Sequence, residues 1–308
     1  MALAHIRRTA SVAAAASTAV ALLALAACGG SGHGSGSPAK ASGAKPKAVV
    51  PARNAADVLS LVEKRTGSAR TAHVESTIVL AASGSQKVTG DVDWTDGVRQ
   101  NVTVAVTGGS MADYATLLNN GAPMRMRFLP DAYHLNAGAA APVFGGKHWI
   151  KYTYADLDAS VGESSGLAPA LESFGPTPAV NAALAAKDVR AVGQETVRGV
   201  AATHYRGTVD ATDLATTAAH LTAAQTRSVR ESLTAAGASA EVIDLWISAD
   251  RLPVKVVTAF DVKTARTTAT TYYSAFGEQV TVEAPAASDV IHSSALARLG
   301  QQKAAKGT

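Results

Sequence analysis

Apolar residues recur at every second position along three successive stretches of this 308-residue chain, at 73–80, 88–94 and 98–106. A period of two is typical of a β-strand that buries one face and leaves the other in water. Gly84-Ser85 and Asp96-Gly97 separate the stretches, and Asp-Gly between alternating runs favours a tight hairpin turn. This part of the chain is therefore predicted to form an antiparallel meander.

Further strand patterns follow in two blocks. They cover residues 124–128, 133–135, 148–152, 189–209, 243–247, 253–257 and 265–274. Almost all the connections within each block are short enough for antiparallel neighbours. A last apolar stretch, 280–285, is predicted to close the domain.

Helical spacing interrupts this strand order in its middle. Residues 167–174 fit one helix and residues 180–186 a second, with Pro176 and Pro178 as breakers between them. Other helical patterns lie at residues 54–66, 111–118 and 212–236.

Two folds accommodate these elements. One is an ordinary β-sandwich, and the other is a single long sheet, strongly curved, with the helices packed on its concave side. A sandwich fills its interior with sheet and leaves no room for helices inserted between the strand blocks. The predicted fold class is therefore α+β, with a strongly curved antiparallel sheet and helices on the concave side.

The N-terminus has the layout of an export signal. Arg7 and Arg8 precede an apolar run, which ends in Leu25-Ala26-Ala27-Cys28. The last four residues resemble the bacterial lipobox, in which the cysteine is acylated and the preceding segment is cut off. We therefore predict a lipoprotein signal peptide over residues 1–27 and a diacylglycerol and palmitate anchor on Cys28. The alternatives are a plain signal peptide and a buried anchor helix.

The sequence after the signal divides into three parts. Residues 28–53 are rich in Gly, Ser, Ala, Lys and Pro, and are predicted to form a flexible tether. Residues 54–290 carry the strand and helix patterns and are predicted to form one domain, and residues 291–308 a loose tail. Because Cys28 is the only cysteine, this domain can have neither disulfides nor thiolate chemistry.

Motifs for catalysis, metal binding and nucleic-acid binding were sought and not found in the sequence. The histidines lack the spacing of a zinc site, and neither a His-Glu-x-x-His nor a Gly-x-Ser-x-Gly motif is present. The formal net charge is +4, without a concentrated Lys/Arg stripe, so nucleic acid is not a predicted partner. No cofactor, no metal and no enzymatic activity are predicted.

Several short patterns occur together in a characteristic order. They are Tyr133-His134-Leu135 and then the stretches 147–152, 192–205, 246–255 and 276–285. Together with the lipobox they resemble the LolA-like lipoproteins of actinobacteria, the family of LppX, LprA, LprF and LprG. The resemblance covers residues 54–290, and the sequence departs from it at 108–122 and in the 212–236 insert.

The resemblance implies a half-barrel sheet whose open side is covered by helices and encloses an apolar cavity for acyl chains. The apolar residues of the predicted concave wall are the candidates for lining it; methionine suits a pocket for variable chains. They are Val88, Val92, Trp94, Val102, Val104, Met124, Met126, Phe128, Leu171 and Phe174. The alternative is that these residues form ordinary core beneath the helices.

Three functions remain open from the sequence. The leading hypothesis is a lipoprotein, anchored through Cys28 to the extracytoplasmic face of the cell membrane, that binds or carries a lipid or glycolipid. The alternative is a regulatory or structural envelope module that binds a protein partner. A hydrolase is the third, because catalytic residues can converge from distant segments.

Overall fold

The computed structural model describes residues 54–80, 84–156, 174–214, 219–262 and 265–295. The predicted signal, Cys28, the tether and Leu171 lie outside these residues. The described chain forms one twelve-stranded sheet. Its strands are β1 (Thr71–Leu80), β2 (Ser85–Asp93), β3 (Arg99–Thr107), β4 (Met124–Phe128), β5 (Ala132–Asn136), β6 (Trp149–Thr153), β7 (Arg190–Val197), β8 (Val200–Asp210), β9 (Ala240–Ser248), β10 (Pro253–Val262), β11 (Ala265–Ser274) and β12 (Val290–His292).

Two meanders make up the sheet. The spatial order is β12-β6-β5-β4-β3-β2-β1-β11-β10-β9-β8-β7, so β1–β6 grow outward from the centre and β7–β11 return to it. The meanders join where β1 pairs antiparallel with β11, from His73 opposite Ser274 to Leu80 opposite Thr267. β12 is the exception to the antiparallel pattern and pairs in parallel with β6.

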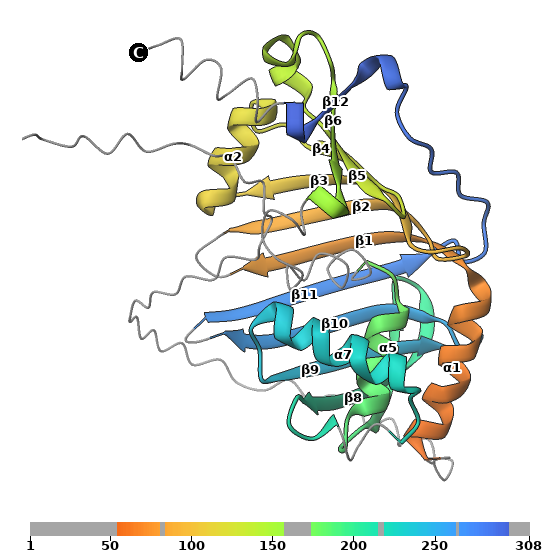
Figure 1. The fold of residues 1–308 in the computed structure, drawn as a ribbon. Helices are drawn as coiled ribbons and strands as arrows, with labels where there is room; N and C mark the ends of the chain where they lie inside the picture. Colours follow the sequence, from red (N-terminus) through yellow and green to blue (C-terminus); the bar gives the residue numbers. More distant parts are fainter. Residues whose placement is uncertain (1–53, 81–83, 157–173, 215–218, 263–264, 296–308) are drawn as a thin grey trace, which may run out of the picture.

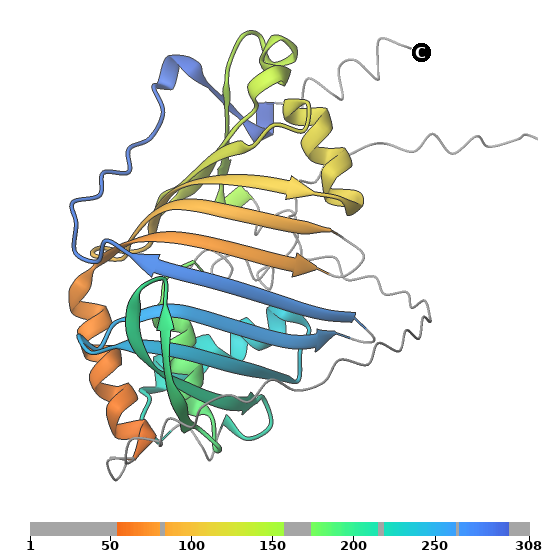
Figure 2. The ribbon, with the colours of Figure 1, turned by 180° about the vertical axis from the view of Figure 1, so that it is seen from behind.

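Among the described residues, four α-helices of nine or more residues accompany the curved sheet (Figures 1 and 2). They are α1 (Ala55–Ala69), α2 (Gly109–Asn119), α5 (Thr177–Ala185) and α7 (Ala223–Ala236). Short 3₁₀ turns lie at η2 (Gly138–Phe144) and η3 (Ala287–Asp289). The predicted fold class, a curved antiparallel sheet with helices on its concave side, is confirmed.

Local sequence explains where the helices begin. The Asn54 side chain accepts a hydrogen bond from the Ala56 amide and caps α1. Thr222 and Gln225 form a reciprocal capping box at the start of α7. In α5, Pro178 lies in the first turn, where a missing N–H costs no intrahelical bond.

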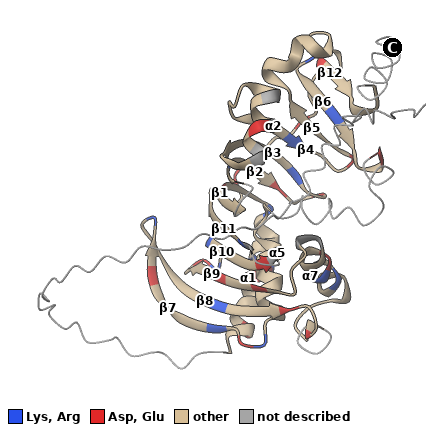
Figure 3. Cartoon of the chain, turned by 90° about the vertical axis from the view of Figure 1, so that its left-hand side faces the viewer, with Lys and Arg blue, Asp and Glu red and all other residues tan. Residues whose placement is uncertain are grey.

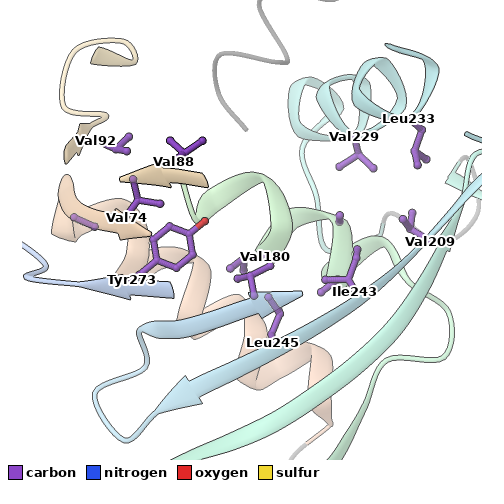
Figure 4. Packing of buried hydrophobic residues seen from close by; sticks show 14 of the residues in the cluster. Val74, Val88, Val92, Val180, Val209, Val229, Leu233, Ile243, Leu245 and Tyr273 are labelled. Carbon is purple, nitrogen blue, oxygen red and sulfur yellow. The ribbon is translucent and has the colours of Figure 1, made fainter. Parts of the chain in front are cut away.

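Apolar side chains of α1 and α5 are buried on the concave side, where α5 packs against β8 and β9 and α1 packs against α5. Leu59 and Val62 of α1 and Val180 of α5 have no exposed surface. Figure 4 shows Val180 beside Leu245 of β9, and Val229 and Leu233 of α7 pointing toward β8 and β9. Burial of such side chains contributes about 1.5–3 kcal/mol each, so this cluster is a main source of stability.

Three details differ from the sequence prediction. The predicted helix over 212–236 is wrong as a single element, because α7 begins at Ala223 and the chain at 211–213 forms a turn that buries Leu214. Residues 278–286 have no regular structure, whereas the sheet continues through β12 to His292, past the predicted domain end at 290. The helix predicted over 167–174 falls, apart from Phe174, outside the described residues.

We expect Gly90→Ala to destabilise the fold. A Cβ at Gly90 would lie 2.1 Å from the Asn101 carbonyl oxygen of the neighbouring strand, at a φ of +157°. Strain of this kind costs about 1–3 kcal/mol in the free energy of unfolding. Gly193→Ala is the control, because nothing lies within 4 Å of its Cβ position. Chemical denaturation that finds equal stability for both variants would contradict the register of β2 and β3.

Candidate functional site

The concave face of the sheet carries most of the predicted site residues. Side chains of alternate residues point to one face, so strand pairing sorts them into rows that cross the sheet. One such row runs through Met124, Val104, Val88, Ser76 and Thr271 on β4, β3, β2, β1 and β11. The rows nearer the start of β1 are mostly apolar and buried.

The structure brings the described candidates together in one cluster. Val88, Val92, Val102, Val104, Met124 and Phe128 are buried in it, and Trp94, Met126 and Phe174 pack against it. Only about 1% of the surface of Val88, Val92 and Val102 is exposed. These three residues belong to a filled part of the concave face, and whether the nine contact a ligand remains a prediction.

A second part of the concave face is less covered. Its residues follow two rows toward the far ends of the same strands, and each is partly exposed. We call them the concave strip: Val106, Gln86, Ile78, Ala269, Thr258, Phe260 and Glu241. Val106 and Phe260 pack against the main cluster, so the strip continues the apolar core onto an accessible surface.

Glu241 is the unexpected member of the concave strip. It shares its face with Ile243 and Leu245, two fully buried residues of β9. Burial raises the pKa of Glu241 to about 7, opposed by a hydrogen bond with the Thr258 side chain. The sequence signal for this was available, since the alternation along 241–247 already puts Glu241 on the apolar face.

The opposite, outer face carries a row of polar and aromatic side chains in register. The row consists of Glu75, Tyr272, Lys255, Trp246 and His204, on β1, β11, β10, β9 and β8. The Lys255 ammonium lies 4.0 Å from the centre of the Trp246 ring, and the His204 ring stacks on Trp246 at 4.2 Å. Each is a favourable contact of a cation or ring with an aromatic face.

The turn between β7 and β8 lies over this outer row. Figure 2 shows the hairpin in front of the sheet, on the face opposite the helices. The Arg198 guanidinium lies 3.8 Å from the centre of the Tyr272 ring and donates to both carboxylate oxygens of Glu75, at 2.6 and 3.2 Å. Trp246 Nε1 donates to Glu195 at 2.9 Å. These contacts bring together the 192–205 and 246–255 patterns of the sequence.

The histidine of this row lies between two carboxylates. His204 Nε2 lies 2.6 Å from Asp244 Oδ1, and Nδ1 lies 3.2 Å from Glu195 Oε1 in a geometry that makes no hydrogen bond. Because both ring nitrogens face carboxylates, neither is placed to accept a proton from a hydroxyl nucleophile. Within the described ranges, no group of three or more His, Cys, Asp or Glu side chains could hold a metal ion.

A polar cleft of about 600 Å³ lies where α1 ends and β1 begins. It is lined by side chains of both charges, among them Arg65, Arg70, Asp93 and Glu278, with the Phe276 ring. Figure 3 shows the same mixture elsewhere, with positive and negative side chains interspersed over sheet and helices. The cleft is distinct from the concave strip. Among the helices that the structure describes, none is long and apolar enough to cross a membrane.

The strand order and the helices on the concave face define an open, curved-sheet protein of the α+β class. No family model matches the chain. The chain is 39% identical over 236 residues to an uncharacterized 31.2 kDa protein of the rplA–rplJ intergenic region of Streptomyces griseus, covering 76% of this chain and 77% of that protein. It is 36% identical over 256 residues to a Streptomyces coelicolor protein named "putative lipoprotein", covering 80% of each. The chain belongs to the family of these Streptomyces proteins.

Two solved structures with this architecture are similar to the chain. LprF from Mycobacterium bovis has a TM-score of 0.46 at 15% identity, with 77% of this chain and 99% of LprF covered. LppX from Mycobacterium tuberculosis has a TM-score of 0.42 at 15% identity, with coverages of 74% and 99%. Both names are among those of the group that the sequence patterns resemble. The strand order itself defines the fold.

We expect Arg198→Ala to loosen the β7–β8 hairpin without unfolding the sheet. The Arg198–Glu75 pair is about half-exposed, and such pairs contribute about 0–1 kcal/mol to global stability. Local opening is more sensitive, so amide hydrogen exchange across β7 should accelerate. Arg190→Ala is the control, since its ion pair with Asp188 stays within its own end of β7. Equal exchange in the two variants would show that the turn contacts do not hold the hairpin.

Proposed function

We propose that this protein is a lipoprotein, anchored at the extracytoplasmic face of the cell membrane, whose concave face binds a hydrophobic ligand of the lipid class. The concave strip is the observation that carries the proposal. Its apolar members, Ile78, Val106 and Phe260, face the helices yet remain partly exposed. A surface of this kind favours an apolar ligand that covers it.

The dimensions of the concave strip suit an acyl chain. It crosses β3, β2, β1, β11, β10 and β9. Neighbouring strands lie about 4.8 Å apart, so the strip extends roughly 24 Å across the sheet. An extended acyl chain could lie along it and contact side chains from several strands at once. The lipobox-like Leu25-Ala26-Ala27-Cys28 and the relative named as a lipoprotein support the anchoring part of the proposal.

The filled part of the concave face favours a second candidate, an envelope module that binds a protein partner. Leu59, Val62 and Val180 are fully buried where α5 packs against β8, β9 and α1, so no ligand can lie there without moving α1 or α5. A protein partner would need only the outer surface. The lipid-binding measurement distinguishes the two functions.

Native mass spectrometry with lipid extraction tests the lipid proposal. Residues 29–308, which retain every described residue, are expected to retain acyl-chain lipids through purification. Ile78→Asp places a charge in the concave strip and should abolish this retention, because a desolvated carboxylate opposes an apolar ligand. Val79→Asp is the matched control: Val79 is the next residue of β1, points to the outer face and is 44% exposed.

Two results would contradict the proposal. One is a folded wild-type protein without bound lipid, which would favour the protein-binding module. The other is equal loss of lipid in the two variants. Circular dichroism and thermal unfolding of Ile78→Asp separate a lost ligand from a lost fold. Val79→Asp, the control, should keep both its fold and its bound lipid.

Cys28→Ser tests the anchor. A serine hydroxyl cannot replace the thiolate that accepts the diacylglyceryl group, so the variant should remain an uncleaved precursor without label from radioactive palmitate. Wild-type protein should take up the label and partition into detergent. Palmitate labelling of the serine variant would place the acylation elsewhere and contradict the assignment.

A further inference from the structure

Glu241 has an ionisable carboxyl group, which the binding of a purely apolar ligand does not need. It lies in the row Leu80, Thr267, Phe260, Glu241 and Val209, which crosses β1, β11, β10, β9 and β8 on the concave face. Its partner on β8, Val209, is fully buried, and its partner on β10, Phe260, is partly exposed. A carboxyl group in such surroundings requires a hydrogen-bonding partner or a cation.

No cation supplies that partner among the described residues. Val229 and Leu233 of α7 point toward β8 and β9 (Figure 4). The charged residues of the same helix, Arg227, Arg230 and Glu231, are exposed. From β9 and β10, the charged residues Asp244, Lys255 and Asp261 belong to the outer face by alternation. On β8, the residue that pairs with Glu241 is the apolar Val209. The side chain that hydrogen-bonds Glu241 is Thr258 of β10.

Hydroxyl groups accompany the carboxyl on this face. The Ser76 and Thr271 hydroxyls bond to each other at 2.9 Å, and Thr258 lies between them and Glu241. The Thr267 hydroxyl is buried and has no hydrogen-bond partner. A buried polar atom without a partner costs about 1–3 kcal/mol, so a ligand oxygen that reached it would be favoured.

We propose that the Glu241 carboxyl donates a hydrogen bond to an acceptor oxygen of an amphiphilic ligand, such as an ester carbonyl, whose chain lies along the concave strip. The inference rests on the lipid-binding function and names the ligand class: acyl esters are preferred over pure hydrocarbons. Thr258 orients the carboxyl, and Thr267 is the second polar contact, on the far side of Phe260.

The sign of the pH dependence follows from the raised pKa. Burial favours the neutral form of Glu241, which predominates below about pH 7 and gives way to the carboxylate above it. Only the neutral carboxyl can donate a hydrogen bond to an ester carbonyl. With a pKa of about 7, the neutral fraction at pH 8.5 is about one thirtieth, so affinity should fall about 30-fold between pH 5.5 and 8.5.

The same group makes stability depend on pH without any ligand. The pKa of Glu241 in the folded state lies above its ordinary value of 4.5. Its neutral form therefore contributes stability that is complete below pH 4.5 and is lost as the pH rises through about 7. Glu241→Gln keeps the size and hydrogen-bonding capacity of the side chain and removes this titration.

Fluorescence of diphenylhexatriene, a hydrocarbon probe, and its displacement by methyl oleate test the inference. The protein is residues 29–308, at pH 5.5 and 8.5. Wild type should bind the probe at both pH values, and displacement by the ester should weaken about 30-fold at pH 8.5 relative to probe binding. Glu241→Gln should show the same displacement at both pH values. Glu231→Gln, at an exposed position of α7, should behave as wild type.

The outcomes separate the two proposals. If wild type binds the probe but Glu241→Gln keeps the full pH dependence, the role of Glu241 is wrong and lipid binding stands. If wild type binds neither compound, the lipid-binding function fails and the inference fails with it. Thermal unfolding at pH 5.5 and 8.5 is the second readout, and equal pH dependence in wild type and Glu241→Gln would also overturn the inference.

Discussion

The pairing of β1 with β11 is the contact on which the rest of the structure depends. It joins residues nearly two hundred positions apart, from His73 opposite Ser274 to Leu80 opposite Thr267. Without it the chain would be two separate meanders, each with an exposed edge. With it, one sheet becomes long enough to curve around α1 and α5. Such a non-local pairing carries a high loop-closure entropy, so we expect it to form late in folding.

The concave face has two unequal parts. In one part Val180 of α5 packs beside Leu245 of β9, and Val88 and Val92 are buried in the same cluster. Toward the ends of the same strands, the side chains of Ile78 and Phe260 stay partly exposed on the same face. On the outer face, the β7–β8 hairpin lies over the sheet and is held through Arg198 and Glu75. The filled part stabilises the fold, and the accessible part is the surface available for a ligand.

The sequence predicts β1, β2 and β3 well because one face of each is more exposed than the other. The alternation along 73–106 places β1, β2 and β3 correctly, and helices between strand blocks favour the curved sheet. The prediction fails where tertiary contacts override the local pattern. At 211–213 the chain turns and the next residue, Leu214, is buried, although the spacing there is helical. The short β12 lacks any period of its own and is defined only by its pairing with β6.

The candidate site, like the fold, could be predicted from the sequence only in part. Alternation identifies the apolar concave residues, such as Val88 and Val102, and the structure gathers them. It does not show which of these residues are buried and which, like Ile78 and Phe260, stay accessible, because that depends on contacts far apart in the chain. Glu241 was missed for a different reason: alternation places it on the apolar face, but a charged residue at the start of a strand is usually solvated.

The most direct test of the central claim is methyl NMR of isoleucine-labelled protein with a lipid spin-labelled near the end of its acyl chain. The chain has six isoleucines, so the spectrum is simple. Ile78 lies in the concave strip, Ile150 is buried in β6, and Ile291 lies at the edge of the sheet in β12. The account predicts that the Ile78 signal broadens first and that of Ile291 does not change. Broadening of Ile291 before Ile78, or of neither, would contradict lipid binding on the concave face.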